Sequence, residues 1–504
     1  DPRIVAYGIV AADEIGLHRG LINTDRNNFA PRFGVAWRVT DNTVLRGGYG
    51  IFYPTSAAQN IRDAFGSSPF NQTLTKRTIA TAPLGGWPGG LTAAGLTPFS
   101  GGVLDTPLDS RPSVNAIPFD LQQPRVEQYN ATVEREVGWQ TGVRVSYLGT
   151  RLHGLIGGVD LNLIPPSDNP YGTTTGDGVT PCTAAGDCRV SAADLARLPF
   201  PTLGDYLASY RNFGSGRSHA LQVEVNRRFA AGLTLNASYT LLDQKGSGFD
   251  VGASSLGGTS YNQFLPENDF AREAFVSRHR FISYGVYELP FGRGRAFGTE
   301  IPRWADLTLG QWQLSWNMFA KSGTGFTPFY TCDNCAPVFP GNIASSFIDA
   351  VGAFAGTSFR PVVKTDVNPY LNSGDQFFNP AAFAPPPVGA DALDNPNIAR
   401  RNSLTGPGTW GVNLGVRKLF PITETVRLDV GADLNNAFNH PLESPTDLQF
   451  ANLGTLSMGV DPATRRPFIA SVAPNPDFGR IRTSFNQESI DNRRLIRLRL
   501  RLTF

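Results

Sequence analysis

The 504-residue sequence predicts an all-β fold, namely a transmembrane, antiparallel, up-and-down β-barrel with long extracellular loops. Three observations lead to this prediction. Apolar and polar residues alternate with a period of two along many segments, short connections between these segments alternate with long ones, and aromatic residues stand near the segment ends. These features are typical of a barrel wall that faces lipid on one side and water on the other.

The composition favours apolar surroundings but excludes helical membrane spans. Charged residues make up 17% of the chain and aromatic residues 11%, whereas roughly 25% of the residues in typical soluble domains are charged. No window approaches the roughly 18 consecutive apolar residues that a transmembrane helix requires. The net charge is only +2 and the basic residues are dispersed, so nucleic acid is excluded as a partner.

The alternation is clearest at the C-terminus, where residues 493–504 read RRLIRLRLRLTF. Successive side chains of a strand point to opposite faces. One face carries Ile496, Leu498, Leu500, Leu502 and Phe504, and the other carries Arg497, Arg499, Arg501 and Thr503. For this segment alone, a soluble amphipathic edge strand fits equally well. We interpret the leucine row as lipid-facing and the arginine row as lumen-facing, and we expect Leu500, Leu502 and Phe504 to form the C-terminal barrel-assembly signal.

Five further pairs of alternating segments predict hairpins. The pairs are 32–39 with 43–53, 126–137 with 141–149, 221–229 with 233–241, 279–289 with 312–320, and 410–420 with 425–435. Residues 3–11 are expected to form the first strand and residues 494–504 the last. The total is about twelve strands, an even number as bacterial barrels require, and both termini then face the periplasm.

The connections between the hairpins are long and rich in Gly, Pro and Asn. They cover residues 54–125, 150–218, 242–278, 321–409 and 436–493. Structureless loops of this length argue against a soluble domain, but outer-membrane barrels combine them with short periplasmic turns. The aromatic residues near strand ends suit a girdle at the headgroup level; they are Trp37, Tyr53, Trp139, Tyr147, Phe229, Tyr239, Trp312, Trp410, Phe420 and Phe504.

Motifs for catalysis are absent from the sequence. It contains no HExxH, GxSxG or Walker motif, and its five histidines are scattered. We therefore predict neither an enzyme nor a cofactor. Arg427, Asp429 and Asp433 share one face of a predicted strand and fit either a substrate path or ion-paired packing inside the lumen. With Arg497, Arg499 and Arg501 they are the lumen-facing polar candidates.

Four cysteines occur as two local pairs, Cys182 with Cys188 and Cys332 with Cys335. Local pairing predicts two small loop disulfides and an oxidising compartment. The alternative is a four-cysteine zinc site, which the second spacing permits, although the first spacing is loose. The sequence begins Asp-Pro without Met or a signal peptide, so we expect a fragment or a mature piece.

Several stretches together resemble the TonB-dependent receptor superfamily, and most closely its Oar-like branch, whose members carry a carboxypeptidase-regulatory-like domain. The stretches are NNFAPRFGVAW (27–37), LRGGYGIFY (45–53), SYLGTR (146–151), HALQVEVNRRF (219–229), RHRF (278–281), LPFGRGR (289–295), FFNPAAF (377–383) and the terminal RLRLTF. The resemblance implies an outer-membrane barrel of 22 strands with an N-terminal plug and a TonB box. Neither is found here, so we expect residues 1–504 to be the C-terminal part of such a barrel, reaching the TonB complex only through missing N-terminal regions.

Three functional hypotheses remain open. The first is a receptor or transporter in the outer membrane of a Gram-negative cell, embedded in lipid by the barrel assembly machinery, that binds and, at full length, imports an unidentified external ligand. The second is a passive porin-like channel or a surface-adhesion barrel. The third is a secreted β-protein that binds carbohydrate. An upstream plug would separate the first from the second, and partition into the outer membrane would separate both from the third.

Overall fold

A computed structural model gives the fold of most of the chain. It describes residues 12–16, 23, 25–54, 99–100, 103–104, 115–116, 118–162, 167–174, 179–184, 188, 193, 196–200, 208–247, 269–274, 276–332, 358–373, 375–392, 395–423, 425–440, 451–480 and 493–504. Within these residues, no helix is both long enough and apolar enough to cross a membrane.

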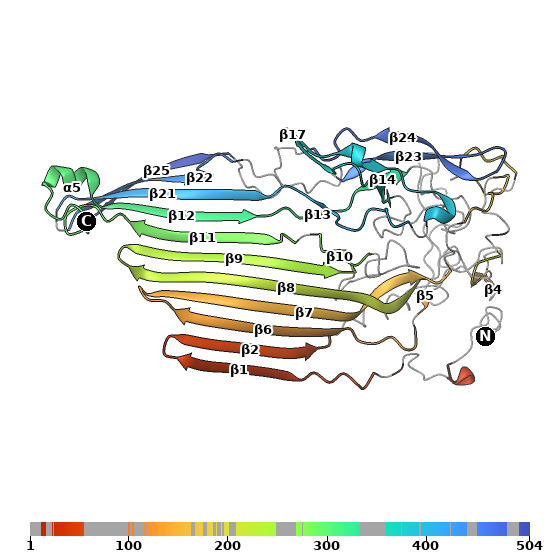
Figure 1. The fold of residues 1–504 in the computed structure, drawn as a ribbon, viewed down its shortest axis with the longest axis horizontal. Helices are drawn as coiled ribbons and strands as arrows, with labels where there is room; N and C mark the ends of the chain where they lie inside the picture. Colours follow the sequence, from red (N-terminus) through yellow and green to blue (C-terminus); the bar gives the residue numbers. More distant parts are fainter. Residues whose placement is uncertain are drawn as a thin grey trace.

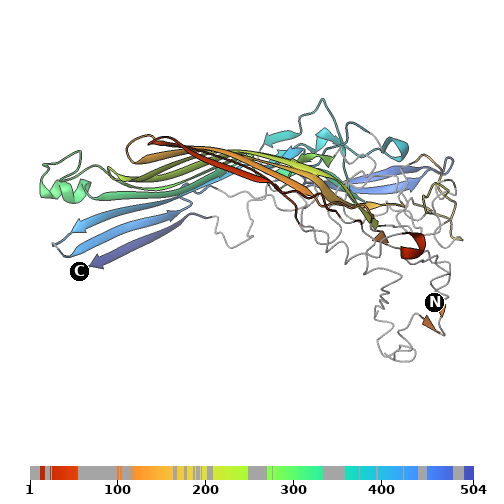
Figure 2. The same ribbon diagram turned by 90° about the horizontal axis from the view of Figure 1, so that it is seen from below.

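Most strands belong to one large, curved antiparallel sheet (Figures 1 and 2). Eleven strands follow one another in chain order: β1 (Arg32–Thr40), β2 (Thr43–Phe52), β6 (Arg125–Glu136), β7 (Thr141–Asp160), β8 (Ala208–Ala230), β9 (Leu233–Gly246), β11 (His279–Glu288), β12 (Trp312–Lys321), β21 (Thr409–Pro421), β22 (Arg427–Asn435) and β25 (Leu495–Thr503). Two short strands lie off this path, β5 (Asn115–Ala116) beside β8 and β10 (Ala271–Arg272) beside β9. This meander is the connectivity of a barrel wall.

The structure confirms the five predicted hairpins and the C-terminal strand. Tight turns join four of the hairpins at one end of the sheet, where the C-terminus also lies (Figure 1). Between β8 and β9, Ala231 and Gly232 have φ of 50° and 79°, as a two-residue turn with the right-handed twist of the strands requires. The expected first strand at 3–11 lies outside the described residues, and among the described strands the sheet does not close on itself.

The prediction was wrong about where β7 and β8 meet the loops. The predicted strand that corresponds to β7 ended at residue 149, whereas β7 has 20 residues and β8 has 23. A strand that crosses the membrane needs only about 9 to 11 residues. The extra length lies beyond the membrane span, where Leu155, Ile156 and Tyr210 are buried. Part of the expected loop 150–218 is therefore strand, because its side chains pack against other loop residues.

The long connections are also less irregular than the sequence indicated. They contain β3 (Phe99–Ser100), β4 (Val103–Leu104), β13 (Gly325–Phe326), β14 (Phe329–Cys332), β15 (Ser358–Phe359), β16 (Val362–Val363), β17 (Tyr370–Ser373), β18 (Gln376–Phe378), β19 (Phe383–Ala384), β20 (Leu404–Thr405), β23 (Asn452–Val460) and β24 (Pro467–Pro474), with the short helices η5 (Pro380–Ala382) and η6 (Gly389–Ala392). A further short helix, η1 (Ala12–Ile15), precedes β1. We call the described residues of 171–188, 325–332, 358–405 and 451–480 the loop module.

One face of the large sheet is apolar across all eleven strands. Residues that lie opposite each other on neighbouring strands share a face, and Val145 lies opposite both Val133 and Val223. The same face continues to β25, where Leu498 and Leu500 are 85% and 73% exposed. A water-soluble monomer rarely exposes an apolar surface of this extent, so this face meets lipid.

Tyrosine–histidine pairs mark the end of this apolar face nearest the loop module. The Tyr147 hydroxyl lies 2.7 Å from His219 Nδ1, and the Tyr239 hydroxyl lies 2.7 Å from His279 Nδ1. Amphipathic rings of this kind favour the boundary between acyl chains and headgroups. Beyond them the same face turns charged, with Arg151 opposite Arg217. The bilayer therefore ends near these rings.

The two faces predict opposite responses to the same new charge. Val223→Arg places a cation in the middle of the apolar face and should destabilise the membrane-folded protein by about 2 to 4 kcal/mol. Gln222→Arg, one residue away on the polar face, should cost less than about 1 kcal/mol because that face is wet. Urea titration of folding into lipid vesicles measures both. Equal costs for the two variants would contradict the assignment of the faces.

Candidate functional site

The polar face of the large sheet carries a ladder of alternating charges. Arg144 on β7 lies opposite Glu134 on β6 and Glu224 on β8. Its guanidinium donates to both carboxylates, at 2.8 Å and 2.9 Å, and Arg46 on β2 reaches Glu134 at 3.4 Å. The side chains are a quarter to a half exposed, and such pairs contribute about 0 to 1 kcal/mol each. The ladder therefore balances charge on a wet surface more than it stabilises the fold.

The six predicted lumen-facing residues all lie on this polar face. On β22 and β25, Asp429 pairs in register with Arg501 and Asp433 with Arg497. Arg427 and Arg499 stand at alternate positions of the same two strands, so the register places all six residues on one face. The register thus brings the six together, while their role in a lumen stays a prediction.

The ladder of Arg46, Glu134, Arg144 and Glu224 was missed by the sequence analysis. A signal for part of it was available, because the predicted hairpin 126–137 with 141–149 already places Glu134 opposite Arg144 once its register is known. The pairing with Glu224 needed the contact between two hairpins, which alternation within one hairpin does not contain.

The loop module lies at the opposite end of the molecule from the tight turns (Figure 1) and has its own core. A parallel pairing of β14 with β23 places residues from two separate connections side by side. Phe359, Phe378 and Leu456 are fully buried there, and Phe478 is nearly so. The described parts of these connections therefore fold together around one core.

Two arginines fix the loop module to the neighbouring connection and to the sheet. Arg360 forms a 2.8 Å ion pair with Asp269, and both side chains are almost fully buried. Arg401 donates to Glu273 at 3.0 Å and to the carbonyl of Gly246, which ends β9. These contacts make the position of the module depend on the wall of the barrel.

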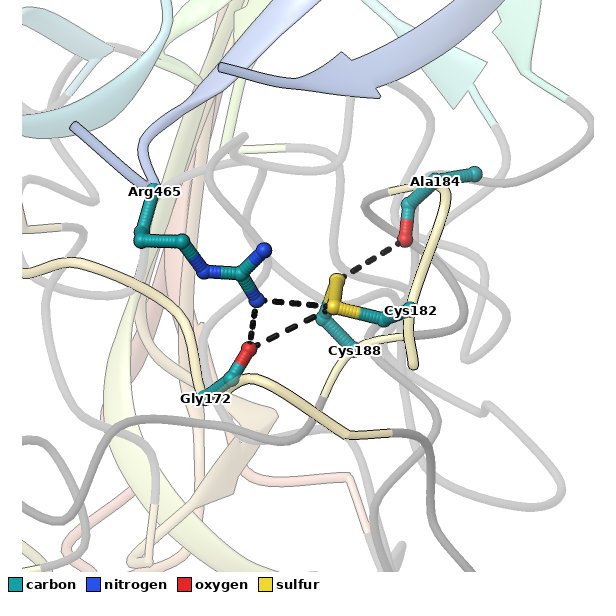
Figure 3. The surroundings of a disulfide bond; sticks show 5 residues. All are labelled: Gly172, Cys182, Ala184, Cys188 and Arg465. Atoms are coloured by element: carbon teal, nitrogen blue, oxygen red, sulfur yellow. Dashed lines mark hydrogen bonds between the residues drawn. A yellow bond between two sulfur atoms is a disulfide. The ribbon is translucent and has the colours of Figure 1, made fainter. Parts of the chain in front are cut away.

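A disulfide joins two cysteines at the core of the loop module (Figure 3): Cys188 is fully buried there, and Cys182 packs against that core. Cys182 and Cys188 are bonded to each other, and Arg465, in the turn between β23 and β24, donates to Cys182 Sγ at 2.9 Å and to the carbonyl of Gly172. Cys332 is also disulfide-bonded, while its predicted partner Cys335 lies outside the described residues. Bonded sulfurs are not thiolates, so Cys182 and Cys188 do not complete a zinc site in this state. In the part of the chain that the structure describes, no group of three or more His, Cys, Asp or Glu is placed to hold a metal ion.

Two loop-module residues have shifted pKa values. Burial raises the pKa of the Tyr330 phenol. The backbone N–H and the hydroxyl of Thr464 donate to Asp461 and lower the pKa of its carboxyl group. Since the folded pKa of Asp461 lies below its unfolded value, its contribution to the stability of the β23–β24 turn is present at neutral pH and is lost as the pH falls through the folded pKa.

The fold and its two faces define an outer-membrane β-barrel protein. The chain belongs to the family whose model is described as outer membrane beta barrel domain, which matches residues 3–496. It is therefore a component of the cell outer membrane. No curated protein matches the sequence.

Most of the chain resembles a part of several solved outer-membrane transporters. The outer membrane transporter YddB from Escherichia coli is 8% identical with a TM-score of 0.36. This match covers 82% of the present chain and 37% of the transporter. The siderophore receptor PirA from Acinetobacter baumannii is 10% identical with a TM-score of 0.33, covering 83% and 38%. The FrpB iron transporter from Neisseria meningitidis is 11% identical with a TM-score of 0.30, covering 82% and 35%. The chain thus spans little more than a third of the length of these proteins.

The buried ion pair of Arg360 and Asp269 should matter far more than an exposed one. Asp269→Leu leaves a buried guanidinium without its counter-charge and should destabilise the loop module by about 3 to 5 kcal/mol. The matched control is Asp375→Leu, because Asp375 and Arg480 are 3.8 Å apart with both side chains well exposed; its cost should stay below about 1 kcal/mol. Hydrogen exchange of the module's amides measures both, and similar protection in the two variants would overturn the prediction.

The double variant Cys182→Ser/Cys188→Ser should loosen the segment between residues 171 and 188 where it packs against the core of the loop module. Opening so short a loop should cost about 2 kcal/mol, and the cost should appear as faster proteolysis between residues 171 and 188. Peptide masses of the non-reduced wild-type protein should contain the linked pair. Free thiols at both positions in protein isolated from the outer membrane would contradict the assignment.

Proposed function

We propose that this chain is the barrel portion of a TonB-dependent receptor, which binds an external ligand through its loop module and, at full length, imports that ligand. The observation that carries the proposal is the register of the large sheet, which separates a lipid-facing surface from a charged surface and ends at a folded module on the long-connection side. A transporter needs a wall in lipid, a wet interior and an external recognition surface.

The motifs that resemble the TonB-dependent receptor superfamily support the same proposal. Six of the eight motif stretches lie at least partly on strands of the wall, including NNFAPRFGVAW, which runs into β1, and HALQVEVNRRF in β8. FFNPAAF lies in the loop module, where Phe378 and Phe383 are in the buried core. The motifs thus serve the wall and the module alike, as expected if both belong to one receptor. In this proposal the protein is not an enzyme, and its ligand is unidentified.

A passive channel is the second candidate, because the polar face suits a water-filled lumen equally well. The two differ in energy coupling. In the proposed receptor, the remaining part of the protein fills the lumen and contacts the TonB complex. In a passive channel, the lumen stays open and no such contact is needed.

Electrical recording of the full-length protein distinguishes these candidates. In planar lipid bilayers, the receptor should show no steady conductance, and its purified form should bind the periplasmic domain of TonB. Removing all residues before this chain should abolish that binding. A steady conductance from the full-length protein, together with no TonB binding, would contradict the proposal and favour the passive channel.

A further inference from the structure

The connection between β11 and β12 differs from the other turns at its end of the sheet. We call residues 290–310 the rim segment; it contains α5 (Arg303–Leu309) and lies at the end where the C-terminus is found (Figure 1). The other hairpins at this end have connections of two to five residues. Since a tight turn would suffice to join β11 to β12, the length of the rim segment suggests a role beyond connecting the strands.

The rim segment is attached to the apolar face of the sheet. Trp312 lies opposite Lys418, and Lys418 lies opposite Val430, so these residues share a face with the leucine row of β25. Trp312 Nε1 donates to the carbonyl of Thr308 at 3.0 Å, and Lys418 Nζ donates to the carbonyl of Gly310. The end of α5 therefore lies against the outer wall and not across the lumen.

The attachment of the rim segment surrounds the charged side chain of Lys418. This residue is a buried cation on the lipid-facing surface, where a bare charge is costly. Its ammonium group lies 5.0 Å from the ring centroids of both Trp312 and Phe420, in addition to its hydrogen bond with Gly310. Two aromatic faces and the backbone carbonyl of Gly310, the residue that follows α5, each attract a cation. The rim segment thus covers the charge from lipid.

The outer surface of the rim segment is unusually apolar for a turn at the water boundary. Trp304 is 72% exposed and Leu309 60%, and the paired rings of Phe291 and Phe297 are about half exposed. The exposed side chain of Arg303 precedes Trp304. Tryptophan and arginine beside aliphatic residues are typical of segments that lie in the headgroup layer.

We propose that the rim segment anchors the protein at the membrane interface by lying in the lipid headgroup layer of the periplasmic leaflet. Trp304 and Leu309 insert beside the phospholipid headgroups, while Arg303 meets their phosphates. Lipid fits this segment better than a protein partner because Trp312 and Lys418 join the segment to the surface that already faces lipid.

Fluorescence quenching in lipid vesicles tests this proposal on the full-length protein. The protein is folded into vesicles of phosphatidylethanolamine and phosphatidylglycerol that are brominated either near the headgroups or near the chain ends. Subtracting the emission of Trp304→Phe from that of the wild type isolates the signal of Trp304. We expect this signal to be lost with bromine near the headgroups and largely kept with bromine near the chain ends.

Trp316→Phe provides the matched control, since Trp316 lies on the same apolar face nearer the middle of β12. Its isolated signal should be lost most strongly with bromine deeper in the bilayer. If the signal of Trp304 is unchanged by both brominated lipids and is quenched by aqueous acrylamide, while Trp316 responds to bromine, the rim segment lies in water and the proposal is wrong. Because Trp304 is exposed, its replacement by Phe leaves the fold intact.

Discussion

The antiparallel hydrogen-bond ladder is the constraint on which the rest of the structure depends. Outside a few β-bulges, it determines which residues of β1 to β25 share a face of the sheet, through ten successive strand pairings. A slip of one residue in any pairing would exchange the two faces of all strands beyond it. The apolar surface, the charge ladder and the placement of the rim segment all follow from this register.

The separation of the two faces also explains why charged side chains have different surroundings on each face. On the polar face, charges such as Arg144 are paired with neighbours at the same level of the sheet and remain in contact with water. On the apolar face, Lys418 is surrounded by two aromatic rings and the backbone carbonyl of Gly310. A charge needs a polar environment in either case; in lipid the protein has to supply that environment itself.

The edges of the sheet set a further requirement. Within the described residues, β1 pairs only with β2 and β25 pairs only with β22. Unpaired backbone groups cost several kcal/mol each in hydrocarbon, so a membrane sheet of this kind has to close. In the proposed receptor, further strands of the full-length protein complete the wall and meet this requirement.

Sequence alone predicted the wall well and the module poorly, for physical reasons. A strand such as β8 repeats its pattern over many residues, so period-two alternation reveals it. The strands of the module have only two to four residues in most cases, and β14 pairs with β23 across more than a hundred residues. The ion pair of Arg360 with Asp269 joins two connections in the same way. Such contacts depend on tertiary packing, for which a local pattern has no signal.

The central claim is that one face of the sheet meets lipid and the other meets water, and cysteine labelling along β8 in native outer membranes tests it most directly. Single cysteines replace Leu221, Gln222, Val223, Glu224, Val225 and Asn226 in turn. The account predicts that a membrane-impermeant maleimide labels the even-numbered positions through the wet interior, and that a lipid-soluble reagent labels the odd-numbered ones. Uniform labelling, or the reverse alternation, would contradict it.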